Sequence, residues 1–353
     1  MKRYRFEVFA RSDLSFVGFA EASEPDIYID ALVSSDSKVA CPGLFTASRG
    51  DFAQIRIDGK VYFQGIIADW SYDGSQTEFT LQQLTELLNT EAFADVNLLK
   101  SQPIETWMSN LLSSVFNGSD VSARLPGFTI TSASSTNGTH AATDNGAYNL
   151  YELLVSFFKV YGVILDISFD YNTRSVNFVF DCVQLHVYKL DLSVSDVLEY
   201  EIEPSIENDS PNKVIIRDQD NPASQLTYYW HPTDFSGTVD TDASTNRVIP
   251  VKTQCDTVQL EEGETFADAS YARAEEILYQ TRYDDLIVVT IRADSKLVTN
   301  WQIGQQYTLY DHGDTYNTLL TGIHSQSMAS IELTFGYVRK RLTQILKMRR
   351  TNS

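Results

Sequence analysis

The chain has 353 residues, of which 43% are hydrophobic, so it is long enough for roughly two or three domains with sizeable cores. Its 47 acidic and 27 basic residues give a formal net charge of −20, which opposes general binding to nucleic acid or to an anionic membrane. No apolar run is long enough for a transmembrane helix. Charged residues at positions 5, 7, 11 and 13 interrupt the start, which argues against a secretory signal peptide. The three cysteines, Cys41, Cys182 and Cys255, lie far apart, which fits synthesis in a reducing cytoplasm.

The first 97 residues are predicted to be mostly β. The segments "YRFEVFA" and "IYIDALV" alternate apolar and polar residues, as half-buried strands do. Asp58-Gly59 and Asp73-Gly74 predict tight hairpin turns, because glycine accepts a positive φ. The period changes to helical at "LTELL". We assign residues 1–97 to a first β-barrel domain.

Residues 98–192 are predicted to form a helix-plus-hairpin α+β domain. The segment "PIETWMSNLLSSVF" carries one apolar helical stripe behind Pro103, and "NLYELLVSFFKVYG" carries another that Gly162 can end as a left-handed cap. Between them, residues 132–146 are rich in Ser, Thr, Asn and Gly and are predicted to be a loop, a candidate flap. A hairpin around "DYNTR" follows.

Residues 193–338 are predicted to form a second β-barrel domain with an inserted helix. Strand-like segments include "VLEYEIE", "NKVIIRD", "QLTYYWH", "DLIVVTIRA" and "SIELTFG", and the helix is predicted in "FADASYARAEEILYQTR". Residues 339–353 form a basic C-terminal tail.

One order of predicted strands, glycines, a hairpin and a leucine-rich segment occurs twice in the sequence. Gly50-Asp51 precedes a strand, Gly65-Ile66, a hairpin and "LTELL"; Gly304-Gln305 precedes a strand, Gly322-Ile323, a hairpin and "LTQIL". Coincidence between two β-meanders is the alternative, but a duplicated barrel explains more of the pattern. The predicted fold class is therefore β-rich α+β, with two related small β-barrel domains and a helix-containing α+β domain between them.

No motif for catalysis, nucleotide binding or metal binding is present, and the five histidines are scattered singly. The segment "DTDASTN", residues 240–246, resembles a calcium loop but lacks its glycine and closing glutamate, so a solvated turn is favoured. We predict no enzymatic activity, no catalytic residue, no cofactor and no metal.

Two segments are candidates for interaction with a partner. Tyr228, Tyr229 and Trp230 could stack on sugars or fill a partner's pocket, although packing in a sheet is favoured. The C-terminal segment "RKRLTQILKMRR" has six basic residues and no acidic one: Arg339, Lys340, Arg341, Lys347, Arg349 and Arg350. It could dock on the acidic body of a neighbouring copy, bind nucleic acid, or be a solvated helix end; the acidic remainder favours the first over the second.

The arrangement resembles the hub proteins at the tip of phage tails. These are the central baseplate hub of contractile-tailed phages and the N-terminal structural part of tail-associated lysins of siphophages. Three segments carry the resemblance in order along nearly the whole chain: "RGDFAQIRIDGKVYFQGIIADWSYDG", "NLYELLVSFFKVYGVILDISFDYNTRSVNFVF", and "ASYARAEEILYQTRYDDLIVVTI" followed by "NWQIGQQYTLYDHG".

The resemblance implies a homotrimer whose six barrels form a pseudo-sixfold ring. Such a ring joins a sixfold tail tube hexamer or distal tail protein to a threefold tip, and it closes or gates the channel. The tape measure protein and receptor-binding or tip proteins are the further implied partners. The implied location is the tail tip of the virion, after synthesis in the bacterial host cytoplasm.

Two alternatives stay open at the level of sequence. One is a cell-wall glycan-degrading enzyme, which needs two carboxylates converging in a cleft. The other is a carbohydrate-binding adhesin of the tail tip that uses Tyr228 to Trp230. The lysin relatives carry a hydrolase or receptor-binding module after the second barrel, and this sequence has none there, which argues against the enzyme.

Overall fold

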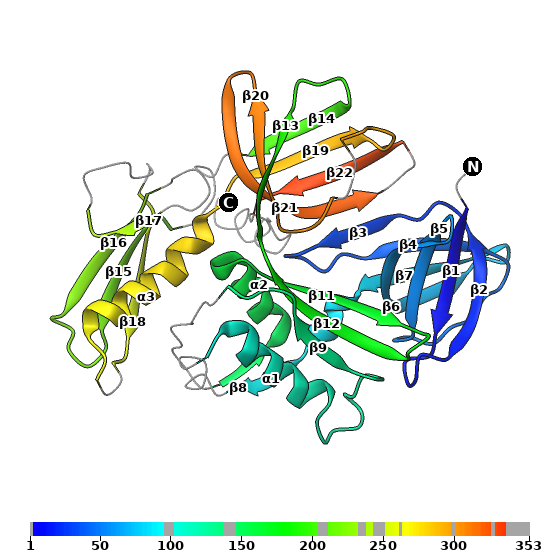
Figure 1. Cartoon of the computed structure of the whole chain (residues 1–353), viewed down its shortest axis with the longest axis horizontal. Helices are drawn as coiled ribbons and strands as arrows, with labels where there is room; N and C mark the ends of the chain where they lie inside the picture. Colours follow the sequence, from blue (N-terminus) through cyan, green and yellow to red (C-terminus); the bar gives the residue numbers. More distant parts are fainter. Residues whose placement is uncertain are drawn as a thin grey trace, which may run out of the picture.

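The computed structural model describes residues 3–94, 102–136, 146–203, 211–231, 238–242, 251–260, 263–297, 301–325 and 329–336. Within these residues the chain forms two β-barrels, a unit with two helices and a three-stranded sheet, and a unit with one helix on a four-stranded sheet (Figure 1). The β-rich fold class predicted from the sequence is confirmed.

The first barrel is a six-stranded antiparallel sheet in the order β2-β1-β5-β6-β7-β4. Alternate side chains, such as Phe6, Phe63 and Phe79, fill its interior. The Asp58-Gly59 turn predicted from the sequence joins β5 to β6 and has positive φ at both residues. Its elements are β1 (Tyr4–Phe9), β2 (Phe16–Ala22), β4 (Ser37–Pro42), β5 (Phe52–Ile57), β6 (Lys60–Tyr72), β7 (Gln76–Gln83) and the 3-10 helix η1 (Leu84–Leu88).

The middle unit packs two helices against the sheet β11-β12-β9. Asn149 caps the second helix by accepting bonds from the backbone N–H groups of Tyr151 and Glu152, and Gly162 ends it at φ 72°, as the sequence predicts. Its elements are α1 (Ile104–Phe116), α2 (Leu150–Tyr161), β9 (Thr129–Ser132), β11 (Val163–Asp170), β12 (Ser175–Cys182) and the pair β8 (Glu91–Ala94) and β10 (Gly146–Asn149).

The second barrel has the strand order β13-β20-β21-β22-β19-β14, and β3 adds to it at β21. Its strands are β13 (Gln184–Asp191), β14 (Val197–Glu203), β19 (Leu286–Arg292), β20 (Gln305–Asp311), β21 (Asp314–Ser325), β22 (Ser330–Phe335) and β3 (Ile27–Asp30). The barrel thus takes strands from all three of the sequence segments 1–97, 98–192 and 193–338. Those boundaries stay a prediction.

An additional unit lies between β14 and β19 in the sequence. It comprises β15 (Lys213–Asp218), β16 (Gln225–His231), β17 (Thr238–Asp240), β18 (Thr253–Val258), α3 (Phe266–Leu278) and the 3-10 helix η4 (Tyr279–Thr281). Its sheet has its own core with α3, including Val214, Ile216 and Ala274. The sequence predicts the helix and the strands "NKVIIRD" and "QLTYYWH", but it assigns these strands to the second barrel, because alternating strands look alike whichever sheet they join.

The duplication is visible in four strands of each barrel. The first barrel contains the strand order β5-β6-β7-β4, and the second contains the order β20-β21-β22-β19. All neighbouring strands in these two orders are antiparallel. The His312-Gly313 turn has positive φ at both residues, as the Asp58-Gly59 turn does. The N–H of Gly50 donates to the carbonyl of Ile67 at 2.8 Å, and that of Gly304 donates to the carbonyl of Leu320 at 2.9 Å. The two barrels therefore share backbone geometry as well as strand order.

The two Gly-Ile pairs do not occupy the same register. Gly65 lies six residues beyond the turn glycine Gly59, whereas Gly322 lies nine beyond Gly313. Both glycines nevertheless sit where the long strand is crowded by its neighbours: a Cβ would lie 2.3 Å from the carbonyl oxygen of Gln82 at Gly65, and 2.8 Å from the carboxylate of Asp30 at Gly322. The "LTQIL" half of the comparison lies outside the described residues.

A Gly65→Ala substitution is expected to lower the free energy of unfolding by about 2 kcal/mol, because the added methyl group meets the backbone of β7. Gly146→Ala is the matched control: its Cβ would meet only the ring of Tyr148, at 3.9 Å. That change is expected to alter stability by less than about 1 kcal/mol. Urea unfolding of both variants measures the difference, and equal stabilities would contradict the crowding at Gly65.

The two barrels are joined by a strand from the first segment. β3 pairs antiparallel with β21 from Gly322↔Asp30 to Ser325↔Ile27. His324 stacks on Tyr28, with ring centroids 3.7 Å apart. Its Nε2 lies 2.7 Å from Oδ1 of Asp26, and its Nδ1 lies 3.7 Å from Oε1 of Glu332 on β22. Partial burial lowers the pKa of His324, but the hydrogen bonds and charges of Glu332 and Asp26 outweigh it and raise the pKa above its ordinary value of 6.5.

The raised pKa of His324 predicts that its stabilising contribution at the pairing of β3 with β21 depends on pH. The stabilisation is fully present below the pKa of the unfolded histidine and is lost as the pH rises through the higher pKa of the folded state. The free energy of unfolding of the wild type is therefore expected to fall, relative to that of His324→Gln, as the pH rises above 6.5. Urea unfolding over a series of pH values on both sides of 6.5 measures this fall. A difference that stays constant with pH would contradict the ion pair.

Candidate functional site: an assembly surface on the first barrel

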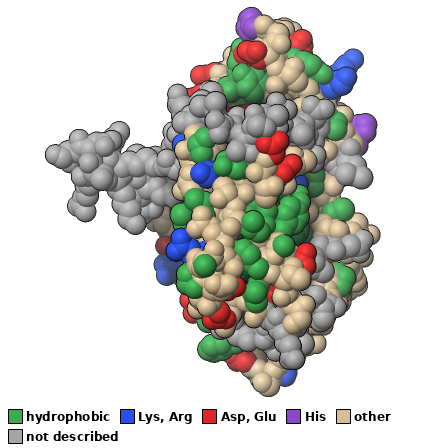
Figure 2. Space-filling view, turned by 90° about the vertical axis from the view of Figure 1, so that its left-hand side faces the viewer, with side chains coloured by type: hydrophobic (Ala, Val, Ile, Leu, Met, Phe, Trp, Pro, Cys, Tyr) green, Lys and Arg blue, Asp and Glu red, His purple; other side chains and the backbone are tan. Residues whose placement is uncertain are grey.

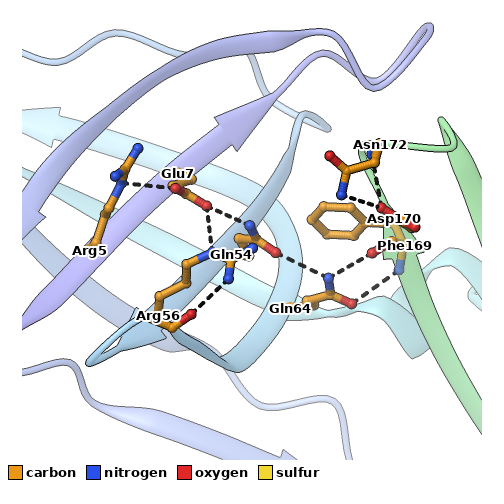
Figure 3. Close-up of polar contacts among 9 residues, drawn as sticks. Arg5, Glu7, Gln54, Arg56, Gln64, Phe169, Asp170 and Asn172 are labelled. Carbon is orange, nitrogen blue, oxygen red and sulfur yellow. Dashed lines mark hydrogen bonds and ion pairs between the residues drawn. The ribbon is translucent and has the colours of Figure 1, made fainter.

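The outer face of the first barrel carries a buried carboxylate (Figure 3). Glu7 lies on β1 between the core residues Phe6 and Val8, so it points away from the interior, yet it is only 7% exposed. Nε of Arg5 lies 2.8 Å from one carboxylate oxygen, and the other accepts bonds from Nε of Arg56 at 3.0 Å and Nε2 of Gln54 at 2.5 Å. The outer face is therefore an ordered polar layer.

This layer continues into the middle unit (Figure 3). Nε2 of Gln64 donates to Oε1 of Gln54 at 3.3 Å and to the carbonyl of Phe169 at 2.8 Å, while the N–H of Phe169 donates to Oε1 of Gln64 at 3.1 Å. One side-chain amide thus pairs with the backbone of β11 as a neighbouring strand would. Each neutral bond contributes about 1 kcal/mol. The network holds the β11–β12 hairpin against the barrel.

Beside this network the first barrel and the adjoining β11–β12 hairpin expose a group of apolar side chains. Phe16, Val17 and Phe19 on β2 are 55%, 46% and 53% exposed, and Tyr171 at the tip of the β11–β12 hairpin is 37% exposed. We call these four residues the β2 surface. Tyr171 stacks on Phe9 at 5.0 Å, Phe9 contacts Phe16 at 5.8 Å, and Phe16 stacks on Phe19 at 6.4 Å, so the three exposed rings are connected through Phe9.

Arg5 links the β2 surface to the polar network. Its guanidinium lies 4.0 Å above the ring of Phe19, while its Nε contacts Glu7. Among the strands of the described ranges, β2 is hydrogen-bonded in a ladder only to β1, and β4 lies along its other side. Near its end, the N–H of Ser23 donates to the carbonyl of Ala40 and partly closes the barrel. A group of exposed aromatic side chains is typical of an interaction surface.

A second set of contacts fixes the α3 unit to the middle unit. Nη2 of Arg282 donates to the carbonyl of Val160 at 2.5 Å, at the carboxyl end of α2, where a positive charge is favourable. The hydroxyl of Tyr161 donates to Oε1 of Glu276 at 3.2 Å, and Glu276 pairs with Arg273 at 2.9 Å. Burial, and then the charge of Glu276, raise the pKa of Tyr161, so its hydroxyl remains a donor.

The aromatic candidates from the sequence lie in the α3 unit. Tyr228 and Trp230 are 3% and 6% exposed, because β16 packs them beneath α3, and the hydroxyl of Tyr228 is 2.8 Å from that of Ser270. Neither ring is available to stack on a sugar. Tyr229 is half-buried, with Nζ of Lys213 5.6 Å from its ring centroid. A contact of Tyr229 with a partner stays a prediction.

Several sequence candidates lie outside the described residues. These are the whole basic segment, Arg339, Lys340, Arg341, Lys347, Arg349 and Arg350, together with the central part of the loop 132–146 and the second half of the calcium-like segment 240–246. Their predicted roles remain predictions.

The described residues offer little chemistry for a metal or a reaction. Within them, no cluster of three or more His, Cys, Asp or Glu side chains could hold a metal ion. None of the described helices is long and apolar enough to span a membrane. Burial raises the pKa of Cys41 to about 12, so its thiol is not a nucleophile at neutral pH. Figure 2 shows, on the face near the α3 unit, scattered acidic and basic side chains around apolar ones, with no continuous basic patch among the side chains it colours.

Comparison with known proteins gives matches only at the level of structure. No family model matches the sequence, and no curated protein sequence matches it. The 43 kDa tail protein of prophage MuSo2 from Shewanella oneidensis is 15% identical, with a TM-score of 0.58 over 96% of this chain and 98% of that one. Prophage tail protein gp18 from Listeria monocytogenes is 10% identical, with a TM-score of 0.54 over 99% and 98%. A chain of the p2 virion baseplate in its activated conformation is 9% identical, with a TM-score of 0.50 over 96% and 100%.

These identities are too low to carry anything but the fold, yet each match extends over nearly the full length of both chains. The overall fold of this chain is therefore shared with these structures along nearly its whole length. The resemblance predicted from the sequence is confirmed: this chain has the fold of phage tail and baseplate proteins.

Proposed function

We propose that the chain is a structural component of a phage tail tip, a baseplate hub located in the virion. The observation that carries this proposal is the end-to-end agreement of its fold with two prophage tail proteins and with a chain of a virion baseplate. A hub works through surfaces, and the ordered feature on the first barrel is a surface: a polar network beside exposed aromatic side chains. The proposal includes no enzymatic activity.

The proposed assembly is a homotrimer with a pseudo-sixfold ring of barrels. Each copy carries two barrels that share a four-stranded antiparallel arrangement, so three copies present six similar modules. Such a ring would join a sixfold tail tube or distal tail protein to a threefold tip and close or gate the channel. The tape measure protein and tip proteins would be its neighbours along the tail axis.

The burial of Tyr228 and Trp230 argues against the carbohydrate-binding adhesin. It relied on exposed aromatic rings at 228–230, and two of the three rings are in the core of the α3 unit. Their removal would unfold the sheet rather than abolish a sugar contact. The structural role is therefore the better-supported function.

Light scattering on the purified chain tests the trimer. One chain has a mass of 39.8 kDa, so a trimer is expected at about 120 kDa over a tenfold range of concentration. Class averages from electron microscopy are expected to show six similar lobes around a centre. A monomer at every concentration, or a particle with three lobes, would contradict the ring.

A further inference from the structure

The outer face of the second barrel has apolar side chains between carboxylates. Alternate residues of β19 fill the core, so Leu286 and Val288 point outward, where both are partly exposed. On the neighbouring strand β14, Glu199 and Glu201 point outward and are exposed. On the other side of β19, Glu332 of β22 also points outward. We call these five residues the acidic face, and Figure 1 shows their three strands side by side.

The basic groups near the acidic face are few, and they leave two of its carboxylates unpaired. Arg292 and His324 are the basic groups of the strands β14, β19, β21 and β22, and each already lies within ion-pair distance of a carboxylate. The exposed Lys296 lies in the turn beyond β19. Glu199 and Glu201 make no ion pair with any residue of the described ranges. They are therefore available to a cation from another segment.

The last described residue, Gly336, lies beside the acidic face. The carbonyl oxygen of Asp285 occupies the space that a Cβ of Gly336 would need. Asp285 directly precedes Leu286, the first outward residue of β19. The link from Gly336 to Arg339 spans at most about 10 Å. The basic segment of residues 339–350 therefore begins within reach of the face.

The sequence of the basic segment complements the acidic face. At about 100° per residue in a helix, Leu342, Ile345 and Leu346 lie on one apolar stripe. Lys340 and Lys347 lie on the opposite side of such a helix. The stripe is flanked on its two sides by arginines: Arg339, Arg341 and Arg350. An apolar stripe between positive charges thus matches an apolar strip between carboxylates.

We propose that residues 339–350 form a helix that docks on the acidic face of the same chain. A helix of this length is about 18 Å long, and the outer face of β19 from Leu286 to Thr290 covers about 13 Å. Because the segment is tethered beside the face, its effective concentration there is high, which favours this site over a neighbouring copy or nucleic acid. The inference goes beyond the proposed hub function and does not depend on the ring.

Photo-cross-linking of the full-length chain tests the contact. The variant Leu342→p-benzoylphenylalanine carries a photoreactive ring on the apolar stripe, and illumination joins this ring to a C–H group that it contacts. We expect a cross-link to a peptide of β14, β19 or β22, identified by mass spectrometry, in a product that migrates as one chain on a denaturing gel. Lys347→p-benzoylphenylalanine is the matched control, because its ring lies on the opposite side of the helix and is expected not to react with these strands.

Each outcome of the cross-linking supports or overturns the contact. A product that migrates as two chains would place the segment on a neighbouring copy and would overturn docking in cis. The absence of a cross-link to the three strands, or equal cross-linking from positions 342 and 347, would show a segment that does not dock on this face. Light scattering on the same sample reports the trimer separately, so a failure of this contact is distinguishable from a failure of the hub.

Charge reversal gives an independent measure. A docked segment is protected from trypsin, which cleaves after Lys and Arg. At low ionic strength, Glu199→Lys with Glu201→Lys is expected to raise the rate of cleavage within residues 339–350 at least about fivefold, because like charges then face the segment. Rates are expressed relative to cleavage after Arg217 on β15, which reports general unfolding.

Glu24→Lys with Glu78→Lys is the matched control for this charge reversal. It makes the same change of charge at exposed positions of the first barrel and is expected to leave the relative rate of cleavage unchanged. Equal relative rates in the two double variants would overturn the proposal.

Discussion

The structure depends on one long strand in each barrel that changes partner along its length. β6 is paired with β5 in its first half and with β7 in its second, and β21 divides itself between β20 and β22 in the same way. A strand shared like this must bend, and the register shifts where it does, between Ile67 and Asp69 in one barrel and between Leu320 and Gly322 in the other. The bend curves the sheet into a barrel. It also brings backbones close together, which is why Gly65 has no room for a Cβ.

A sheet curved in this way without full closure leaves edges, and the rest of the chain is arranged around them. β3 leaves the first barrel and adds to β21 of the second, so one joint is made by backbone pairing and by the stack of His324 on Tyr28. The β11–β12 hairpin is held to the first barrel by the amide of Gln64. Two barrels and the middle unit are therefore tied together by directional bonds, which fix the angles at which the remaining edges point.

The local backbone conformation could be predicted from the sequence wherever a single residue determines it. Asp58-Gly59 required a turn with positive φ, and Gly162 required a left-handed helix end; both are present. The apolar stripes of α1 and α2 were equally clear, because helical periodicity needs no distant partner. The duplicated strand order could also be recognised, with spacings that differ by a few residues between the copies. The two Gly-Ile pairs lie at different registers, since crowding at a bend, not position in a repeat, requires each glycine.

The sequence could not predict which sheet a strand joins or which aromatic residues are buried, because both depend on tertiary packing. The strands at 213–218 and 225–231 alternate like barrel strands, and only their packing under α3 shows that they form another sheet. The same packing buries Tyr228 and Trp230, which the sequence leaves open as surface aromatics. The β2 surface escaped notice for the opposite reason: in "FVGFAEA" the aromatic residues look like core, and only the pairing of Phe19 with Glu7 places that ring on the outer face of the barrel.

The two barrels share the arrangement of the four strands β5-β6-β7-β4 and β20-β21-β22-β19, and they differ in the strands beside these four. The turn geometry and the bonds of Gly50 and Gly304 are alike, whereas the strand beside β5 is antiparallel and the strand beside β20 is parallel. β2 at the border of the first barrel carries exposed aromatic side chains and Glu21, whereas β14 at the border of the second carries Glu199 and Glu201. Border strands that differ on otherwise similar modules give each barrel its own contacts, so the two barrels of one chain are not interchangeable.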